Sequence, residues 1–192
     1  LDRCGDGIEA PAVLFDNYAG ACMATRHLLT LHGGPVYYCG FYLKPSSAAK
    51  RFDGWRHTMA QFGFDNLASY LVGEIPAECS DYDSDFHSAM LEKFFLAHPE
   101  PLSILVVSDV LALRVHKTCE RFNRSLGKDV FLVGFDDIPE IPSGPSISCV
   151  ITDRRKMGEE ALHLLFLDTV PTCWRKLLPV HLQVRQSSGQ VS

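Results

Sequence analysis

Short apolar runs alternate with longer amphipathic segments along almost the whole chain. The runs occupy residues 12–15, 36–40, 70–72, 102–107, 130–134 and 147–151. Within each run, apolar side chains follow one another without alternation, which is typical of strands buried on both faces of a parallel sheet. Residues 179–185 instead alternate apolar and polar side chains, which predicts a strand with one wetter face.

The segments between the runs carry apolar side chains at helical spacing. Helices are predicted to begin near Ser47, Asp85, Asp109 and Asp153, and another to cover residues 20–31. The predicted apolar faces of the first four comprise Phe52, Trp55, Met59, Phe62, Phe86, Met90, Phe94, Leu111, Val115, Cys119, Phe122, Met157, Ala161, Leu164 and Leu165. Strands and helices in this order predict an α/β fold with a doubly wound parallel sheet.

The charge balance argues against a nucleic-acid-binding surface. The chain has 18 Lys and Arg against 23 Asp and Glu, a net charge of −5. Its one dense basic run, residues 154–156, opens a predicted helix, whereas binding to nucleic acid needs clustered positive charge. No apolar stretch approaches the ~20 residues that span a bilayer, so no membrane partner is expected.

The cysteines and the first residues indicate where the protein works. Seven widely spaced cysteines include no C-x-x-C pair, which disfavours a zinc site and favours a reducing cytoplasm. No metal or other cofactor is expected. The chain begins at Leu1 without the basic start and apolar centre of a signal peptide, so we expect a fragment of a longer protein.

Enzyme motifs are weak throughout. Residues 5–10 match G-x-G-x-x-A, but a strand follows them where a dinucleotide-binding loop needs a helix. There is no G-x-S-x-G and no H-E-x-x-H motif. The Asp136-Asp137 pair suits either a metal or acid–base chemistry, yet no partner base is apparent, and adjacent acids in a loop are usually structural or cap helices.

Polar residues follow the predicted strands at the edge where open α/β sheets bind ligands. They are Asp16-Asn17, Ser108-Asp109, Asp136-Asp137 and Thr152-Asp153. The alternative is that these residues cap the helices that follow. Both roles are compatible, because capping uses only one of several oxygens. A long proline-containing connection, residues 136–146, lies at the same predicted edge.

Several blocks of sequence resemble, in order, the effector domain of the lactose-repressor/galactose-repressor family of transcription regulators. The blocks are FDNYAGA at 15–21, ATRHLL at 24–29, SSAAKRFDGW at 46–55, SDVLAL at 108–113, DVFLVGFDDIP at 129–139, DRRKMGEEA at 153–161, LPVHL at 178–182 and RQSSG at 185–189. Together they span nearly the whole chain, which makes the resemblance specific.

The resemblance implies a periplasmic-binding-protein-like fold of two α/β lobes joined by three crossing strands, with the ligand between the lobes. Residues 1–15 would end the N-terminal lobe, and 152–170 would return to it. Residues 16–151 would form a nearly complete C-terminal lobe, and 171–192 its final strand and tail. The DNA-binding headpiece and the first half of the N-terminal lobe would be absent.

The resemblance also implies ligand contacts at particular positions. Arg51 and Asp136 match the family's main contacts: a guanidinium fork donates to two oxygens and a carboxylate accepts from two hydroxyls, which suits a vicinal diol. The structural alternative is that these two residues pair with each other or cap helices and never touch the ligand. Asp2 and Asp153 match weaker contact positions. Ser108 stands where the family usually has a ligand-binding Asn, so the ligand or its pose is expected to differ. The aromatic residues Phe41, Tyr42 and Trp55 are candidates for stacking on a sugar face, although the helical spacing of Trp55 favours a place in the core.

By this resemblance the chain is the effector-sensing domain of a cytoplasmic, homodimeric regulator, which is not an enzyme. A sugar or similar small molecule would bind between the lobes and control allosterically a DNA-binding headpiece missing from this chain. The alternative is a periplasmic sugar-binding protein of a transporter or chemoreceptor, against which the cysteines count. An enzyme of doubly wound fold comes third.

Overall fold

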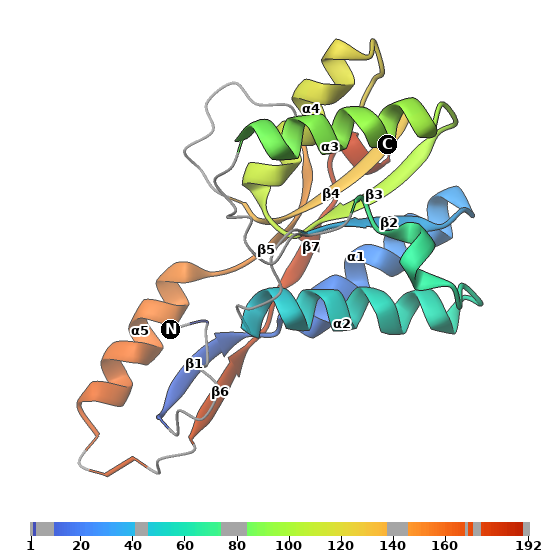
Figure 1. Ribbon diagram of the computed structural model, residues 1–192. Coiled ribbons are helices and arrows are strands. Elements are labelled where there is room, and N and C mark those ends of the chain that lie inside the picture. The colour runs from blue at the N-terminus through green and yellow to red at the C-terminus, as the bar shows by residue number, and fades with distance from the viewer. Residues whose placement is uncertain are drawn as a thin grey trace.

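The computed structural model describes residues 2, 10–40, 46–73, 84–137, 146–167, 169–170 and 174–189. Its strands form two sheets: a five-stranded sheet in the order β2-β3-β4-β5-β7 and a two-stranded sheet, β1-β6. The five-stranded sheet with helices α1 to α4 is here called the larger unit, and the two-stranded sheet with helix α5 the smaller unit. Figure 1 shows the smaller unit extending from one end of the larger.

The larger sheet is parallel except at one edge. Strands β2 (Val36–Cys39), β3 (Leu102–Val106), β4 (Val130–Asp136) and β5 (Ser148–Ile151) run parallel, and β7 (His181–Gln183) pairs antiparallel with β5. Every residue of β2 and β3 is buried. The unalternating apolar runs therefore correspond to strands covered on both faces, as predicted.

Two pairs of helices cover the two faces of the larger sheet. Helices α1 (Asn17–His32) and α2 (Ser46–Gln61) pack on one face, around Leu28, Trp55 and Phe135. Helices α3 (Ser84–Ala97) and α4 (Asp109–Arg121) pack on the other, around Leu91 and Ile104. Trp55 is fully buried and its indole Nε1 donates to the Val36 carbonyl at 2.8 Å, which confirms its core role.

The smaller unit is a minimal α/β layer. Strand β1 (Ala12–Phe15) pairs in parallel with β6 (Arg175–Leu178), and α5 (Arg154–Leu165) packs against them. Its core contains Val13, Phe15, Met157 and Leu178. Strand β6 is not among the expected strands, because only its last residue, Leu178, is fully buried and its sequence has little apolar pattern.

Some local expectations are wrong. A strand was expected over residues 70–72. Instead, residues 67–70 form a 3-10 helix, and within 70–72 only Leu71 forms a β-bridge, to Tyr38. Phe62 is 44% exposed because α2 ends at Gln61, before it. Leu165 is 78% exposed because α5 has only two strands to pack against.

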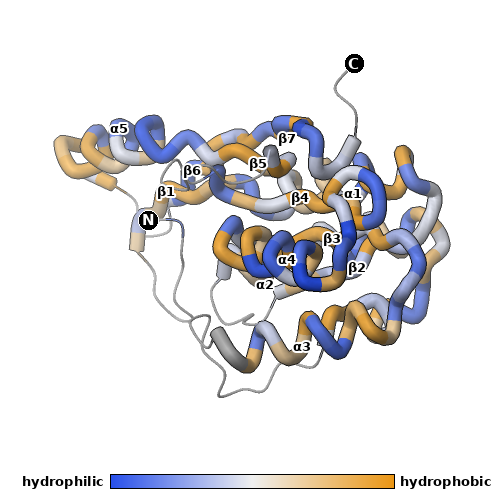
Figure 2. Tube along the Cα trace, turned by 90° about the horizontal axis from the view of Figure 1, so that it is seen from above, coloured by the Kyte–Doolittle hydropathy of each residue, from blue (hydrophilic) through white to orange (hydrophobic). Residues whose placement is uncertain are grey.

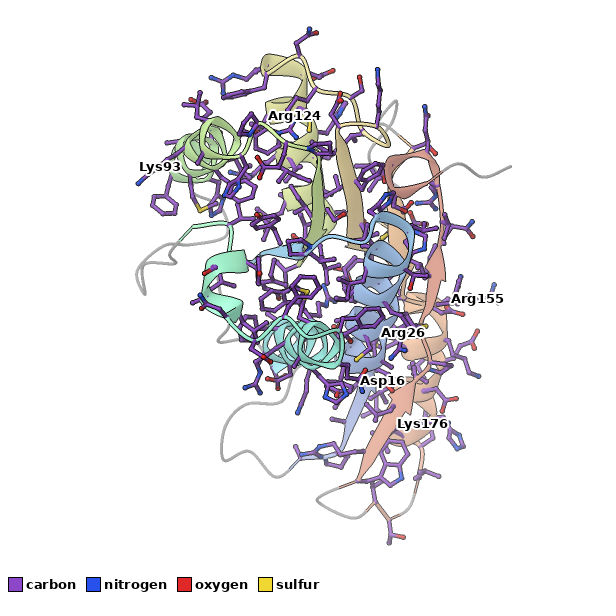
Figure 3. The ribbon with its side chains drawn as sticks, turned by 90° about the vertical axis from the view of Figure 1, so that its right-hand side faces the viewer. Asp16, Arg26, Lys93, Arg124, Arg155 and Lys176 are labelled. Atoms are coloured by element: carbon purple, nitrogen blue, oxygen red, sulfur yellow. The ribbon has the colours of Figure 1, made fainter. Side chains whose placement is uncertain are left out.

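The chain passes between the two units three times. The connections are residues 15–17, between β1 and α1; residues 151–154, between β5 and α5; and residues 178–181, between β6 and β7. The first and third lie side by side, since the Asp16 amide donates to the Leu178 carbonyl at 2.9 Å. Figure 3 shows Asp16 where the units meet, with Lys176 on the smaller unit and Arg124 and Lys93 at the far end of the larger. In the described part of the chain, no helix is long and apolar enough to cross a membrane.

Candidate ligand site between the two units

Arg51 and Asp136, which are far apart in sequence, form a direct ion pair. Arg51 Nη2 lies 2.8 Å from Asp136 Oδ1, and Nη1 lies 3.2 Å from Oδ2. Arg51 projects from the second turn of α2 and Asp136 ends β4. Arg51 is 5% exposed, whereas the Asp136 side chain remains 24% exposed. The bidentate geometry fixes both planar groups, and the carboxylate faces solvent more than its partner does.

The remaining contacts of Arg51 use nearly all of its donors. Nη1 also donates to the Val107 carbonyl at 2.6 Å, and Nε donates to Asn17 Oδ1 at 2.7 Å. The guanidinium lies over the Phe135 ring, 4.2 Å from its centre. Because a guanidinium has five N–H groups, one N–H on Nη2 is left for another acceptor. The fork expected to grip two ligand oxygens is therefore occupied by Asp136 in this structure, and the spare lone pairs of Asp136 are the more accessible groups.

The backbone at the end of β4 adopts a conformation that residues other than glycine rarely adopt. Asp136 has φ of 92° and Asp137 has φ of 50°. Such conformations cost about 1–3 kcal/mol each and persist where surrounding contacts hold them. Arg154 Nη2 donates to the Asp136 carbonyl at 3.3 Å, and the Asp137 amide donates to Cys149 Sγ at 3.2 Å. These contacts hold Asp136 in place for Arg51.

Asp137 does not take part in the Arg51 pair. Its two carboxylate oxygens accept from Arg185 at 2.7 and 2.9 Å. This pairing holds the pKa of the Asp137 carboxyl below its ordinary value. Burial, and the neighbouring Asp109 carboxylate, raise the pKa of the Cys149 thiol, which keeps it protonated. The second acid of the Asp136-Asp137 pair is therefore held by Arg185, and only the first pairs with Arg51.

Asn17 joins the pair to the smaller unit and to Asp2. Its Nδ2 donates to Asp2 Oδ1 and to the Phe15 carbonyl, both at 3.2 Å. Asp2 Oδ1 also accepts from the Phe15 amide at 3.2 Å. Asp2, Asn17, Arg51 and Asp136 thus form one continuous polar chain. Asn17 is among the polar residues expected at strand ends, but it is not among the expected ligand contacts.

The other expected contact residues have different positions. Asp153 caps α5, its Oδ1 accepting from the Lys156 amide at 2.8 Å, as the capping alternative predicts. Ser108 precedes α4, and its side chain makes no cap hydrogen bond. It directly follows Val107, whose carbonyl binds Arg51. Phe41 and Tyr42 lie outside the described residues, as do residues 5–9 of the glycine motif and 138–145 of the proline-containing connection.

A cavity of about 460 Å³ lies between the two units; Asp2 and Asn17 of this polar chain line it, whereas Arg51 and Asp136 do not. Asp2, Leu14 and Leu177 line it from the smaller unit's side, and Ser47 and Lys50 line it from α2. Its volume lies in the range of clefts that hold small molecules. Among the described residues, no group of three His, Cys, Asp or Glu side chains could hold a metal ion. The lining combines an apolar wall with carboxylates, hydroxyls and the Lys50 ammonium, a set of donors and acceptors that fits a polyhydroxylated ligand.

Two sheets joined by three connections, with polar groups gathered where they meet, define a protein of the periplasmic-binding type. The model of the periplasmic binding protein-like domain family matches residues 25–188. The chain belongs to this family, and its resemblance to the effector domains of the lactose-repressor family is confirmed.

Curated relatives are similar to this chain in sequence, and solved structures share its fold. The ribose operon repressor of Bacillus subtilis (strain 168) is 26% identical over 175 residues, covering 86% of this chain and 48% of that protein. A complex of the transcriptional regulator CelR with cellobiose superposes with a TM-score of 0.81 at 22% identity, over 94% of this chain and 55% of that one. A LacI-family regulator from Enterococcus faecium with bound ribose gives a TM-score of 0.78 at 17% identity, over 96% and 67%. The chain spans about half the length of the curated relatives it matches.

Proposed function

We propose that this chain is the effector-sensing part of a transcription regulator, and that it binds a sugar or a similar polyhydroxylated molecule between its two units. The observation that carries the proposal is the polar chain of Asp2, Asn17, Arg51 and Asp136, whose first two members line a cavity between the units. The curated relatives are regulators, two of them ribose operon repressors. These relatives favour a regulator over the alternative of a periplasmic transport protein, and over an enzyme.

The ligand would act by favouring one arrangement of the two units over another. The smaller unit, with β1, β6 and α5, would be part of an N-terminal lobe, and the larger unit the C-terminal lobe. Because β6 pairs with β1, this assignment places β6 in the N-terminal lobe. The final segment of the C-terminal lobe, expected at residues 171–192, would then begin only after Leu178. Arg51 and Asp136 would bind the ligand, with Asp2 and Ser108 as nearby contacts; Phe41 and Asp153 are retained as weaker candidates.

The regulator would work in the cytoplasm as a homodimer and would reach DNA through a headpiece outside this chain. The acidic chain is not expected to bind DNA specifically by itself. A gel shift at physiological salt should show no competitor-resistant binding by this chain, and sedimentation of the longer protein should show a dimer. Specific DNA binding by the chain, or a monomeric longer protein at micromolar concentration, would contradict these two points.

A thermal-shift screen tests the choice of ligand class. The panel comprises pentoses, hexoses, disaccharides, sugar phosphates and purines, with ribose and cellobiose among them. A ligand that binds only the native state at 100 times its Kd raises the free energy of unfolding by about 2.7 kcal/mol. We expect a dose-dependent rise in melting temperature with at least one sugar. A response to purines alone would replace the sugar by a heterocyclic ligand, and no response at millimolar concentrations would contradict the proposal.

A further inference from the structure

We infer that Asn17 is a positioning residue: it holds the Arg51 guanidinium in its orientation toward Asp136 and ties that pair to the smaller unit. Asn17 is the first residue of α1, directly after the connection from β1, and is 4% exposed. The inference about geometry stands on the contacts of Asn17 alone. That the positioned pair serves a ligand rests on the proposed function.

The hydrogen-bond partners of Asn17 fix the orientation of its amide. Nδ2 faces two acceptors, Asp2 Oδ1 and the Phe15 carbonyl, each at 3.2 Å. Oδ1 faces a donor, Arg51 Nε, at 2.7 Å. Reversing the amide would place an N–H against the guanidinium and an oxygen against a carboxylate. The orientation therefore follows from the partners, and both ends of the side chain are used.

Asn17 is not needed to cap its own helix. Asp16 does this, because its Oδ1 accepts from the Ala19 amide at 2.9 Å. Asn17 is thereby left free to bond across the molecule, to a residue 34 positions away in sequence. A polar side chain that is this deeply buried costs stability unless it is bonded, so its bonds account for its presence.

The position of Asn17 makes it a link between the units. Its Nδ2 bonds to Phe15 in β1 and to Asp2, whose own amide donates to the Val13 carbonyl at 3.0 Å. Its Oδ1 bonds to Arg51 in α2, on the larger unit. A shift of the guanidinium toward a ligand would strain or break the Nε bond and change the support that Asp2 and β1 receive. This physical path from the ion pair to the smaller unit needs a direct test of coupling.

Two substitutions separate the two ends of the Asn17 side chain. Asn17→Leu keeps the number and branching of the side-chain heavy atoms and removes both the acceptor and the donor. Asn17→Asp keeps an acceptor for Arg51 Nε but removes the N–H groups and places a second carboxylate beside Asp2. Asn66→Leu is the matched control, because among the described residues the Asn66 side-chain amide bonds only to Ser69 Oγ, at 2.8 Å, on the exposed surface.

The main readout needs no ligand. Hydrogen exchange of the Arg51 Nε–H, identified by its loss in Arg51→Met, is followed by nitrogen-15 NMR, together with that of the Phe15 amide. Asn17→Leu should speed exchange of the Arg51 Nε–H by about tenfold or more, the factor expected for a hydrogen bond to a charged group. Asn17→Asp should leave the Nε–H protected while the Phe15 amide, deprived of a well-placed Asp2, exchanges faster. Asn66→Leu should change neither.

The outcomes separate positioning from simple structural support. If Asn17→Leu lowers the melting temperature yet leaves the Arg51 Nε–H protected, the positioning role is wrong. If Asn17→Leu does not fold, Asn17→Asp decides: unchanged exchange of the Phe15 amide would break the proposed link. With any sugar found by the screen, both variants should bind about tenfold more weakly than Asn66→Leu. If no sugar binds the unsubstituted protein, the proposed function fails, while the exchange measurement still tests Asn17.

Discussion

The larger and smaller units are built from the same elements but differ in how completely they bury them. The larger unit has helices on both faces of its sheet, and two neighbouring strands, β2 and β3, are buried along their whole length. The smaller unit has two strands and one helix, and its residues Leu162, Leu165, Phe166 and Leu177 are all more than half exposed. Figure 2 shows hydrophobic residues at the far end of α5, away from both sheets.

The packing of the larger unit explains why it can hold the candidate site in place. A sheet that is covered on both faces holds Arg51 and Asp136 in one geometry, since close-packed interiors resist continuous deformation. In the proposed function the larger unit would supply these two groups, and a ligand would favour one arrangement of the two units over another.

The largest expected contrast between the units comes from truncating the larger core. Trp55→Ala removes a fully buried indole and its hydrogen bond to the Val36 carbonyl. We expect a loss of about 3–5 kcal/mol in the free energy of unfolding, measured by urea denaturation. Leu177→Ala, in the smaller unit, should change it by less than about 0.5 kcal/mol, because that side chain is 60% exposed. Similar losses in the two variants would contradict the contrast.

A smaller effect is expected where α1 and α2 cross. A Cβ added to Gly54 would lie 2.4 Å from the Tyr18 carbonyl oxygen, and backbone cannot move aside as a side chain can. Gly54→Ala should therefore destabilise the protein by about 1–3 kcal/mol. Gly34→Ala is the control, because a Cβ there meets nothing within 4 Å. Equal stability of both variants, compared by thermal unfolding, would show that the helices separate without cost.

The smallest effect concerns pH and Asp137. Arg185 keeps the pKa of the Asp137 carboxyl below its ordinary value of 3.8. The folded protein therefore holds this proton less tightly than the unfolded chain, so the pairing stabilises the fold above pH 3.8 and its contribution is lost as pH falls below that value. Since the carboxylate is partly exposed, the effect should be below about 1 kcal/mol. Asp137→Asn should flatten this part of the stability–pH profile between pH 5 and 3. An unchanged profile would show that the Asp137–Arg185 pair does not contribute to the pH dependence of stability.

Apolar periodicity was sufficient to predict most elements of the larger unit. Its parallel strands are largely buried, and its helices begin within a few residues of the expected positions. Apolar periodicity did not predict β6, whose side chains are largely exposed. It wrongly predicted a strand at residues 70–72, where Leu71 forms a single bridge. An isolated two-stranded sheet gives little burial pattern to read.

The candidate site was predicted only in part. The resemblance to the lactose-repressor family picked out Arg51 and Asp136, and the structure brings them together. It did not pick out Asn17, because a polar residue at a helix start is usually interpreted as a cap. The signal was the doublet itself: Asp16 already caps α1, so the second polar side chain needs another partner. The alternative that Arg51 and Asp136 pair with each other follows from their opposite charges, and the structure shows this pair.

Arg51 and Asp136 are proposed to bind the ligand directly. Calorimetric titration with the sugar that gives the largest thermal shift tests it most directly, using Asp136→Asn and Arg51→Met beside the unsubstituted protein. Contacts to charged groups contribute about 1.5–3 kcal/mol each, so both variants should bind roughly tenfold to a hundredfold more weakly while remaining folded. Near-normal affinity in both variants, with the loss appearing in melting temperature instead, would show that the pair only supports the fold and would contradict the claim.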